Sequence, residues 1–151
     1  MVEGYRAVRV PPAPFASSAG ARATFRATRR RDTAPELALR RELFSLGHRF
    51  LVDATPPGVS RRRRADVLLR GSRVAVLVHG CFWHCCPVHF VLPRTNQAWW
   101  EVKFAAIKHR DADTLHQITE AGWLPVVVWE HEDTRLVARA LSELHWSRAE
   151  R

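Results

Sequence analysis

The stretch of residues 65–79 limits the possible folds more than any other feature of the sequence. Two apolar runs, Ala65–Arg70 and Arg73–His79, are separated only by Gly71-Ser72, a glycine-first pair typical of a two-residue β-hairpin turn. Every residue from Val74 to Val78 is apolar, as in a central strand that is buried on both faces. The sequence therefore predicts an antiparallel hairpin at the centre of a covered sheet.

Helical and extended patterns flank this hairpin on both sides. A helix is predicted to begin at Thr33, with Glu36 completing a capping box, and to end at Gly47. Further along, we expect a short strand over residues 48–52, a long helix over 95–121, a strand over 124–129 and a last helix capped by Asp133 or Thr134. A hairpin followed by a crossover helix and one more strand predicts an α/β fold, with a mixed central sheet and helices on its faces.

The length of 151 residues fits one domain, and 46% hydrophobic residues are enough to build its core. Residues 1–30 are rich in Pro, Ala, Ser and Arg without clear periodicity. We interpret them as a flexible basic arm, of a kind that can order on DNA, before a domain over residues 31–151. The sequence contains neither a long apolar run nor a signal-peptide pattern. We therefore expect a cytoplasmic, nucleoid-associated monomer that does not enter a membrane.

The formal net charge is +9, from 24 basic and 15 acidic side chains, and only Lys103 and Lys108 among the basic ones are lysines. The guanidinium group of arginine suits phosphate and guanine recognition. A GC-rich genome also enriches arginine, but the charge excess itself favours a polyanionic partner, usually nucleic acid. The candidate contacts to a nucleic-acid backbone are the basic arm and the run of Arg61, Arg62, Arg63 and Arg64.

One carboxylate lies on the predicted hairpin. With a two-residue turn, Asp66 falls opposite Leu77, and His79 lies on the same face as a diagonal neighbour, about 7–8 Å away between backbones. Polar side chains at the end of central strands are costly unless they have a purpose. Asp66 suits a Mg²⁺ ligand, although pairing with the nearby arginines is an equal alternative.

A second carboxylate, Asp111, interrupts the apolar stripe of the predicted long helix. The other members of this stripe share helical spacing and are Trp100, Phe104, Ile107, Leu115 and Ile118. A lone acid on a core-facing stripe is usually paired or functional. His109 and Arg110 are available partners, so a purely structural role stays open.

Three cysteines, Cys81, Cys85 and Cys86, lie within six residues and are flanked by histidines, a density that indicates a metal site rather than disulfides. Cys81, Cys86 and His89 have usable ligand spacings, and His131 could reach back from the end of the last strand as a fourth ligand. Two thiolates and two imidazoles would form a closed, structural Zn²⁺ site. Cys85 is a competing ligand, and a buried thiol pair without metal is the other alternative.

His84 and three aromatic residues occupy the same region. A clamped loop would fix the direction of His84, whose neutral ring could take a proton from a water that attacks phosphorus, unless His84 is itself a zinc ligand. Phe82, Trp83 and Trp100 could wedge between bases. From the residues alone, packing in the core is the favoured interpretation of these three rings.

Several of these stretches combine into a known pattern: Arg31-Asp32-Thr33-Ala34-Pro35-Glu36, Ala65-Asp66, Gly80-Cys81-Phe82-Trp83-His84, Cys86-Pro87-Val88-His89, Asn96–Trp100 and Val128-Trp129-Glu130-His131. Over residues of about 25 to 145 the chain resembles the Vsr endonuclease family. The resemblance implies a restriction-endonuclease-like fold and Mg²⁺-dependent nicking of one strand beside a T:G mismatch, which arises when 5-methylcytosine deaminates. It also implies double-stranded DNA as substrate, with mismatch-repair proteins as candidate partners.

The resemblance also implies roles for the candidate residues. Asp66 aligns with the metal-binding aspartate, and Val78 replaces a threonine, so that only its backbone carbonyl could be a second ligand. His84 aligns with the histidine that activates the water, and the supporting catalytic positions are His79, Glu36 and Asp111. The structural zinc site aligns with Cys81, Cys86, His89 and His131, and the intercalating aromatics, contrary to the core interpretation, with Phe82, Trp83 and Trp100.

Three other functions are compatible with the same residues. A related nuclease of different target, such as a restriction-type enzyme, would cut matched duplex. A non-catalytic, zinc-stabilised DNA-binding module would bind DNA without Mg²⁺, and a redox sensor based on Cys85 and Cys86 would lose zinc on mild oxidation. The joint presence of Asp66, His79 and His84 argues against the two functions that are not enzymatic.

Overall fold

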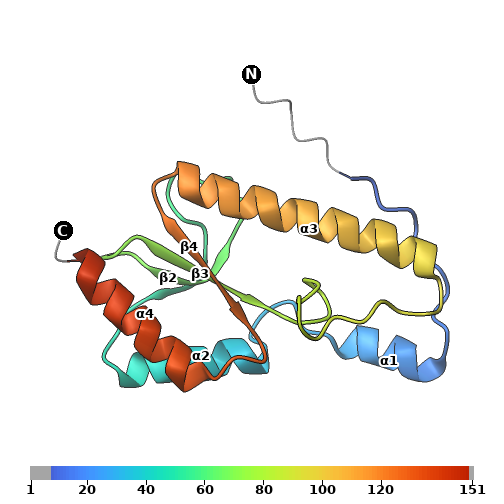
Figure 1. The fold of residues 1–151 in the computed structure, drawn as a ribbon, viewed down its shortest axis with the longest axis horizontal. Helices are drawn as coiled ribbons and strands as arrows, with labels where there is room; N and C mark the ends of the chain where they lie inside the picture. The colour runs from blue at the N-terminus through green and yellow to red at the C-terminus, as the bar shows by residue number, and fades with distance from the viewer. Residues whose placement is uncertain (1–7, 150–151) are drawn as a thin grey trace.

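The computed structural model describes residues 8–149, which form four helices and four strands (Figure 1). In chain order these are α1 (Ala19–Ala27), α2 (Ala34–Ser45), β1 (Leu51–Ala54), β2 (Ala65–Leu69), β3 (Val74–His79), α3 (Gln97–Glu120), β4 (Leu124–Trp129) and α4 (Thr134–Ala149). The sheet has the order β1-β2-β3-β4, with β2 antiparallel to both neighbours and β4 parallel to β3. The prediction of an α/β fold with a mixed sheet is confirmed.

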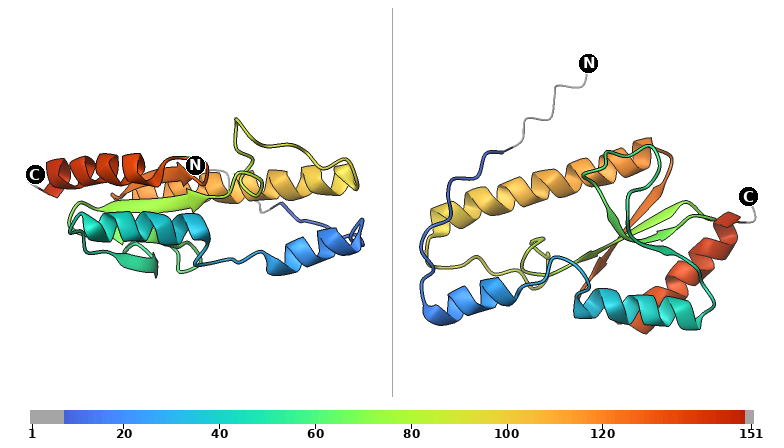
Figure 2. Two further views of the ribbon diagram at one scale, coloured as in Figure 1. Left: turned by 90° about the horizontal axis from the view of Figure 1, so that it is seen from below. Right: turned by 180° about the vertical axis from the view of Figure 1, so that it is seen from behind.

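Helices cover both faces of the sheet, as Figures 1 and 2 show. α3 lies on one face, and α2 and α4 lie together on the other. The cluster under α3 contains Ala65, Leu68, Ala75, Leu77, Ile118 and Trp123. The cluster under α2 and α4 contains Leu39, Leu43, Val67, Leu69, Val74, Val76, Val128, Ala138 and Leu141. Because β2 and β3 contribute to both clusters, they are the central strands that the apolar run predicted.

The hairpin has the predicted register but a different turn. β2 and β3 pair so that Asp66 stands opposite Leu77. Gly71 does not adopt the left-handed conformation that a glycine-first two-residue turn requires, whereas Arg73 does, with φ of 53°. The predicted turn type is therefore wrong, but the amide of Arg73 still donates to the carbonyl of Arg70 at 3.2 Å, so the strands keep their alignment.

α1 is the largest departure from the sequence analysis, which expected no regular structure before residue 31. The Ser18 hydroxyl caps this helix by accepting a hydrogen bond from the amide of Ala21 at 3.0 Å. None of its nine residues is buried, and it lies in a segment rich in Pro, Ala, Ser and Arg, whose composition indicated a flexible arm instead of a helix. Residues 1–7 of the predicted arm and residues 150–151 of the predicted domain lie outside the described residues.

The start of α2 differs in detail from the predicted capping box. Thr33 precedes the helix as expected, but its hydroxyl donates to Glu36 Oε1 at 2.8 Å instead of accepting from a helical amide. Glu36 Oε2 accepts from the backbone amide of Asp32 at 2.9 Å, one residue earlier than in a capping box. The buried Glu36 therefore ties the linker between α1 and α2 to the body of the domain.

Side-chain contacts set the start of β1 and the start of α4. The first strand begins at Leu51 and not at His48, because His48 is buried and its Nε2 lies 2.6 Å from the hydroxyl of Ser142 on α4. Of the two residues proposed to cap the last helix, Asp133 does so, since its Oδ1 accepts from the amide of Arg135 at 2.8 Å.

α3 is longer than the sheet requires, and this excess positions the site. Its 24 residues extend over about 36 Å, and its N-terminal half projects beyond the strands toward α1 (Figure 1). There Trp100, Phe104 and Ile107 pack against the loop that follows β3 instead of against the sheet. Among residues 8–149, neither this helix nor any other is long and apolar enough to cross a bilayer.

Candidate active site and metal centre

A groove of about 1410 Å³ separates α1 from the projecting half of α3. Its cationic lining comes from the arm, the arginine run and α3, and consists of Arg22, Arg26, Arg29, Arg30, Arg62, Arg63, Arg64, Arg94, Lys103 and Arg110. At its floor, the ends of β2 and β3 bring in Asp66 and His79, the loop after β3 brings in His84, and α3 brings in Asp111. A basic groove with acids and imidazoles at its floor suits a polyanionic ligand and acid–base chemistry.

Asp66 stands on β2, and no cationic side chain among residues 8–149 forms an ion pair with it. Its Oδ2 accepts a hydrogen bond from the backbone amide of Val78 at 2.6 Å. Burial raises the pKa of Asp66 to about 6; the Val78 amide acts against this rise, and the charge of Glu36 adds to it. The alternative that Asp66 merely pairs with nearby arginines is not what the structure shows, because Arg63 and Arg64 pair with other carboxylates.

His84 and Asp111 form a hydrogen-bonded pair, with 2.6 Å between His84 Nδ1 and Asp111 Oδ2. Burial by itself would raise the pKa of Asp111, but the hydrogen bond with His84 and the neighbouring positive charges outweigh it and lower that pKa. The carboxylate is thus ionised at neutral pH and must accept, so His84 Nδ1 carries the proton. When the ring of His84 is neutral, its lone pair is therefore on Nε2, which is the arrangement of a carboxylate-oriented general base.

The ring of His79 stacks on the ring of His84, with centroids 3.8 Å apart and planes 9° from parallel. Burial, assisted by the charge of His84, lowers the pKa of His79 to about 4, so this ring is neutral at pH 7. Ligand atoms of His79, His84 and Asp111 lie within 4.8 Å of one another. However, imidazoles in parallel planes cannot both direct their in-plane lone pairs at one ion. We therefore interpret this group as a site for proton transfer and not as a metal site.

Glu36 reaches the same groove from α2, but its carboxylate is already occupied. Besides the amide of Asp32 and the hydroxyl of Thr33, it accepts from Arg40 Nη2 at 2.9 Å. The side chain of Glu36 is 5% exposed and that of Arg40 is 11% exposed. The predicted supporting residue therefore lies beside Asp66 as a buried ion pair and not as a free acid.

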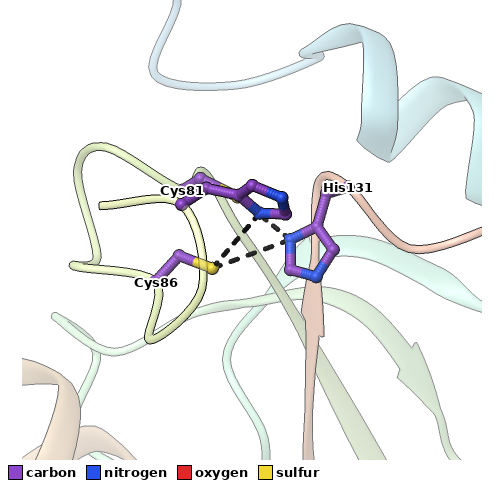
Figure 3. Close-up of side chains that lie close together, drawn as sticks. Cys81, Cys86 and His131 are labelled. Carbon is purple, nitrogen blue, oxygen red and sulfur yellow. Dashed lines mark hydrogen bonds between the residues drawn. The ribbon is translucent and has the colours of Figure 1, made fainter. Parts of the chain in front are cut away.

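The second cluster lies at the other side of the loop after β3. Cys81 and Cys86 point from this loop toward His131, which follows β4 (Figure 3). With His89 they form a group whose ligand atoms all lie within 4.8 Å of one another. The distance from Cys81 Sγ to His131 Nδ1 is 3.1 Å and that from Cys86 Sγ to His89 Nδ1 is 3.8 Å. These values bracket the roughly 3.6 Å that separates sulfur and nitrogen ligands around a tetrahedral zinc ion.

The loop excludes two competing residues from this group. His84 is turned toward Asp111. Cys85, in a left-handed conformation with φ of 55°, packs among the aromatic residues beside Phe104. The donor set that the structure assembles is therefore two thiols and two imidazoles, which can bind a divalent metal.

The predicted aromatic residues Phe82, Trp83 and Trp100 lie together on the wall of the groove. Phe25 of α1 joins them from the opposite wall, with its ring centroid 5.6 Å from that of Trp100 and 5.8 Å from that of Trp83. Trp100 is 8% exposed, whereas Phe82 and Trp83 are half-buried. These rings thus pack on one another and on α1.

The four arginines of the predicted backbone contact are not equivalent. Arg63 Nη2 lies 2.5 Å from Asp113 Oδ2, and Arg64 Nε lies 2.7 Å from Asp53 Oδ1. Arg62, Arg63 and Arg64 line the groove, whereas the exposed Arg61 lies outside its lining. Three of the four are therefore placed where a phosphate backbone could reach them.

The sequence analysis missed Phe25 and Glu130. Glu130 Oε1 accepts from the amide of Cys81 at 2.6 Å and so fixes the start of the loop that carries both clusters. Its signal was available, because an acid directly after a buried strand and directly before a metal-ligand candidate is unusual. Phe25 had no signal, since it lies in a segment without periodicity.

The sequence is similar to those of several known proteins. The family model described as DNA mismatch endonuclease Vsr matches residues 17–88. The type II nicking enzyme V.NaeI of Lentzea aerocolonigenes is 39% identical over 136 residues, which cover 89% of this chain and 81% of that enzyme. The type II nicking enzyme V.XorIIP of Xanthomonas oryzae pv. oryzae is 34% identical, over 69% and 74% of the two chains. The DNA mismatch endonuclease Vsr of Escherichia coli is 36% identical, over 70% and 65%. The chain therefore belongs to the Vsr family of DNA endonucleases.

Proposed function

We propose that the protein is a Mg²⁺-dependent endonuclease that nicks one DNA strand beside a T:G mismatch and so starts repair of deaminated 5-methylcytosine. One observation carries this proposal: Asp66, a carboxylate without a cationic partner, and His84, an imidazole oriented by Asp111, open on to the same basic groove. Relatives named mismatch endonuclease and nicking enzyme support a nick rather than a double-strand cut.

The groove floor fits a hard divalent cation. Asp66 offers a carboxylate whose charge is destabilised by burial, which a bound cation would reverse. The backbone carbonyl of Val78, whose amide already contacts Asp66, is the proposed second ligand. When bound there, Mg²⁺ would polarise the scissile phosphate and stabilise the charge that develops on it.

His84 is the proposed general base. Because Asp111 accepts the Nδ1 proton, Nε2 is free to take a proton from the water that attacks phosphorus. His79 stays neutral and stacked, so it supports the ring of His84 and adds no competing positive charge near the phosphate. Glu36 acts from beside Asp66 as a supporting residue.

We propose that the Cys81, Cys86, His89 and His131 group holds Zn²⁺. Thiolate and imidazole ligands favour zinc over magnesium, and four protein ligands leave no position open for chemistry. Its role would be to fix the loop that carries Phe82, Trp83 and His84.

The groove walls suit duplex DNA that contains a mismatched base pair. Phe82, Trp83 and Trp100 would insert beside the mismatch, where unstacking costs least, and this would favour mismatched over matched sites. Arg61–Arg64 and the arm of residues 1–30 would hold the phosphates against the domain of residues 31–151, so affinity should fall with salt. Mismatch-repair proteins remain candidate partners.

The test is strand cleavage of an end-labelled duplex with one T:G pair, in Mg²⁺, beside the same duplex with a T:A pair. We expect one nick on the T-containing strand of the mismatched duplex only, and none with Asp66→Ala. Binding without a cut across several flanking sequences would leave only a zinc-stabilised DNA-binding module.

The relatives named type II nicking enzymes support a second candidate, a nuclease whose target is a particular sequence. It predicts cleavage that depends on the flanking bases and that persists when the T:G pair is replaced by a matched pair. The same duplex series therefore separates the two candidates.

A further inference from the structure

Behind the groove floor lies a buried charge that the proposed function does not use. The guanidinium of Arg40, on α2, donates from Nη1 to Asp32 Oδ1 at 2.6 Å and from Nη2 to Glu36 Oε2 at 2.9 Å. Its side chain is 11% exposed, and its Nε is buried without a hydrogen-bond partner. Burying an arginine this deeply is costly, so its two carboxylate contacts need an explanation beyond surface pairing.

Arg40 does more than pair with one acid. Glu36 accepts from three donors, namely the amide of Asp32, the hydroxyl of Thr33 and Nη2 of Arg40. A carboxylate has about four lone-pair positions, so these contacts leave little capacity for another ligand. The charge of Glu36 is balanced and its oxygens are held in place.

The carboxylate of Asp66, unlike that of Glu36, has no paired cation among the described residues. Its one hydrogen bond comes from the amide of Val78, and no side chain of the described residues forms an ion pair with it. The charges of Glu36 and Arg40 both reach Asp66, one raising and the other lowering its pKa. Among the buried charges here, Glu36 and Arg40 cancel and Asp66 remains unbalanced. The pairs of Asp53 with Arg31 and Arg64 involve exposed arginines, which solvent screens.

We propose that Arg40 is a positioning residue that keeps Glu36 and Asp32 from acting as metal ligands, so that the catalytic divalent cation is held at Asp66. This inference rests on the proposed function, because it concerns the same metal. Without Arg40, the carboxylate of Glu36 on α2 would keep its negative charge without a paired cation, and it would attract the metal ion. The cation would bind more tightly, but away from the position set by Asp66 and Val78, and nicking would slow.

This gives an experiment in which two readouts move in opposite directions. Binding of Mn²⁺ to the DNA-free protein is measured from the electron paramagnetic resonance signal of free Mn²⁺, and nicking is measured at saturating Mn²⁺. For Arg40→Met we expect Mn²⁺ affinity to rise at least about tenfold while nicking falls. A merely structural arginine would lower both, so unchanged or weaker Mn²⁺ binding in a folded Arg40→Met protein overturns the proposal.

Three variants control this result. Arg41→Met removes an exposed arginine next to Arg40 on the same helix, and we expect Mn²⁺ affinity to be unchanged. Glu36→Gln removes the buried partner of Arg40 and leaves it paired with the half-exposed Asp32, so Mn²⁺ binding should weaken about tenfold. This variant tests the charge argument even if Arg40→Met does not fold. The double variant Arg40→Met/Glu36→Gln removes both charges and should return the affinity to near that of the natural protein. If Glu36 were a ligand, the double variant would stay weak, and the proposal would be wrong.

Failure of the proposed function looks different. If Asp66→Asn leaves Mn²⁺ binding unchanged, then Asp66 is not the metal ligand and the proposed function fails at its metal site. If Asp66→Asn abolishes binding but Arg40→Met does not tighten it, only the role of Arg40 is refuted.

Discussion

The acidic and imidazole residues at the floor of the groove form its polar end, and the aromatic residues on its walls form its aromatic end. These two ends are built in different ways. The polar end, formed by Asp66, His79, His84 and Asp111, stands on β2, β3 and α3 and is joined by short hydrogen bonds and a ring stack. The aromatic end, formed by Phe25, Phe82, Trp83 and Trp100, is closed by α1, a helix that buries none of its residues. One end is fixed by the core, and the other by contacts between rings.

Under the proposed function, this difference separates the residues of catalysis from those of DNA recognition. Catalytic groups need positions held to a fraction of an ångström, which strands and a packed helix provide. Rings that must separate to admit a base pair are better carried by elements that cost little to move. Substitutions at the polar end should therefore change the rate of cleavage on bound DNA, and substitutions at the aromatic end should change binding and selectivity.

The largest effect should follow from Asp66→Asn. Nicking should fall by at least about a thousandfold, because the amide is a poor ligand for Mg²⁺. Stability in Mg²⁺-free buffer should move the other way. The pKa of Asp66 is raised from its usual value of 3.8 to about 6, so its contribution to stability is full below pH 3.8 and is lost as pH rises through 6. Urea unfolding at pH 7.5 should show the variant about 1–3 kcal/mol more stable.

Asp113→Asn is the matched control for this prediction. Asp113 is also buried, but it pairs with Arg63 and its pKa is lowered. Removing its charge should therefore destabilise the protein at pH 7.5, with nicking retained at saturating DNA. If both amide variants were destabilised alike, the unbalanced charge at Asp66 would not exist.

The next effect is that of His84→Ala, which should lower kcat by about 10²–10⁴-fold with DNA affinity unchanged.

Asp111→Asn tests how the proposed general base, His84, is oriented. An asparagine can offer His84 Nδ1 a donor as well as an acceptor, so the wrong tautomer becomes accessible and kcat falls less than for His84→Ala. Single-turnover kinetics on prebound duplex gives both rates, and a loss confined to KM would contradict these roles.

The sequence was most informative where local spacing determines geometry. The hairpin register follows from period-two alternation and a short turn, so the position of Asp66 relative to Leu77 and His79 could be predicted. The cysteine and histidine spacing likewise indicated Cys81, Cys86 and His89 as ligands, with His131 as a possible fourth and Cys85 as a competitor. The family resemblance implied the four side chains that converge in the structure. The turn type was wrong because the left-handed residue is Arg73, and no residue-type preference indicates an arginine there.

The missed features all depend on contacts between distant segments. Phe25 meets Trp100 only because α1 folds back across the groove, and a contact between such distant segments cannot be predicted from local spacing. Arg40 was assigned no role from the sequence, because only the tertiary structure buries it against Asp32 and Glu36. The four residues of the polar end were thus all candidates from the sequence, whereas the aromatic end lacked Phe25 until the fold placed it beside Trp100.

Loss of the proposed zinc should affect both ends of the groove at once, because one loop carries residues of both ends. Cys86→Ala, which removes one of the four donors, should lower the melting temperature by about 10 °C and reduce both cleavage and mismatch selectivity. Cys85→Ser is the control, since Cys85 lies outside the donor group. Zinc content by atomic absorption and thermal unfolding measure the effect. Equal zinc content in the two variants would exclude this donor set.

The smallest effect should come from Phe25→Ala. This variant most directly tests whether the aromatic end affects DNA binding and not the rate of cleavage. Stacking of one ring is worth about 1–3 kcal/mol, so binding to the T:G duplex should weaken roughly tenfold while kcat on saturating duplex stays within about twofold. Phe44→Ala, which removes an exposed ring of α2 that does not line the groove, should change neither. Fluorescence anisotropy gives the affinity, and single-turnover cleavage gives the rate. If Phe25→Ala instead lowered kcat tenfold at unchanged affinity, the aromatic end would take part in positioning the reacting phosphate. The division between recognition and chemistry would then have to be drawn elsewhere along the groove.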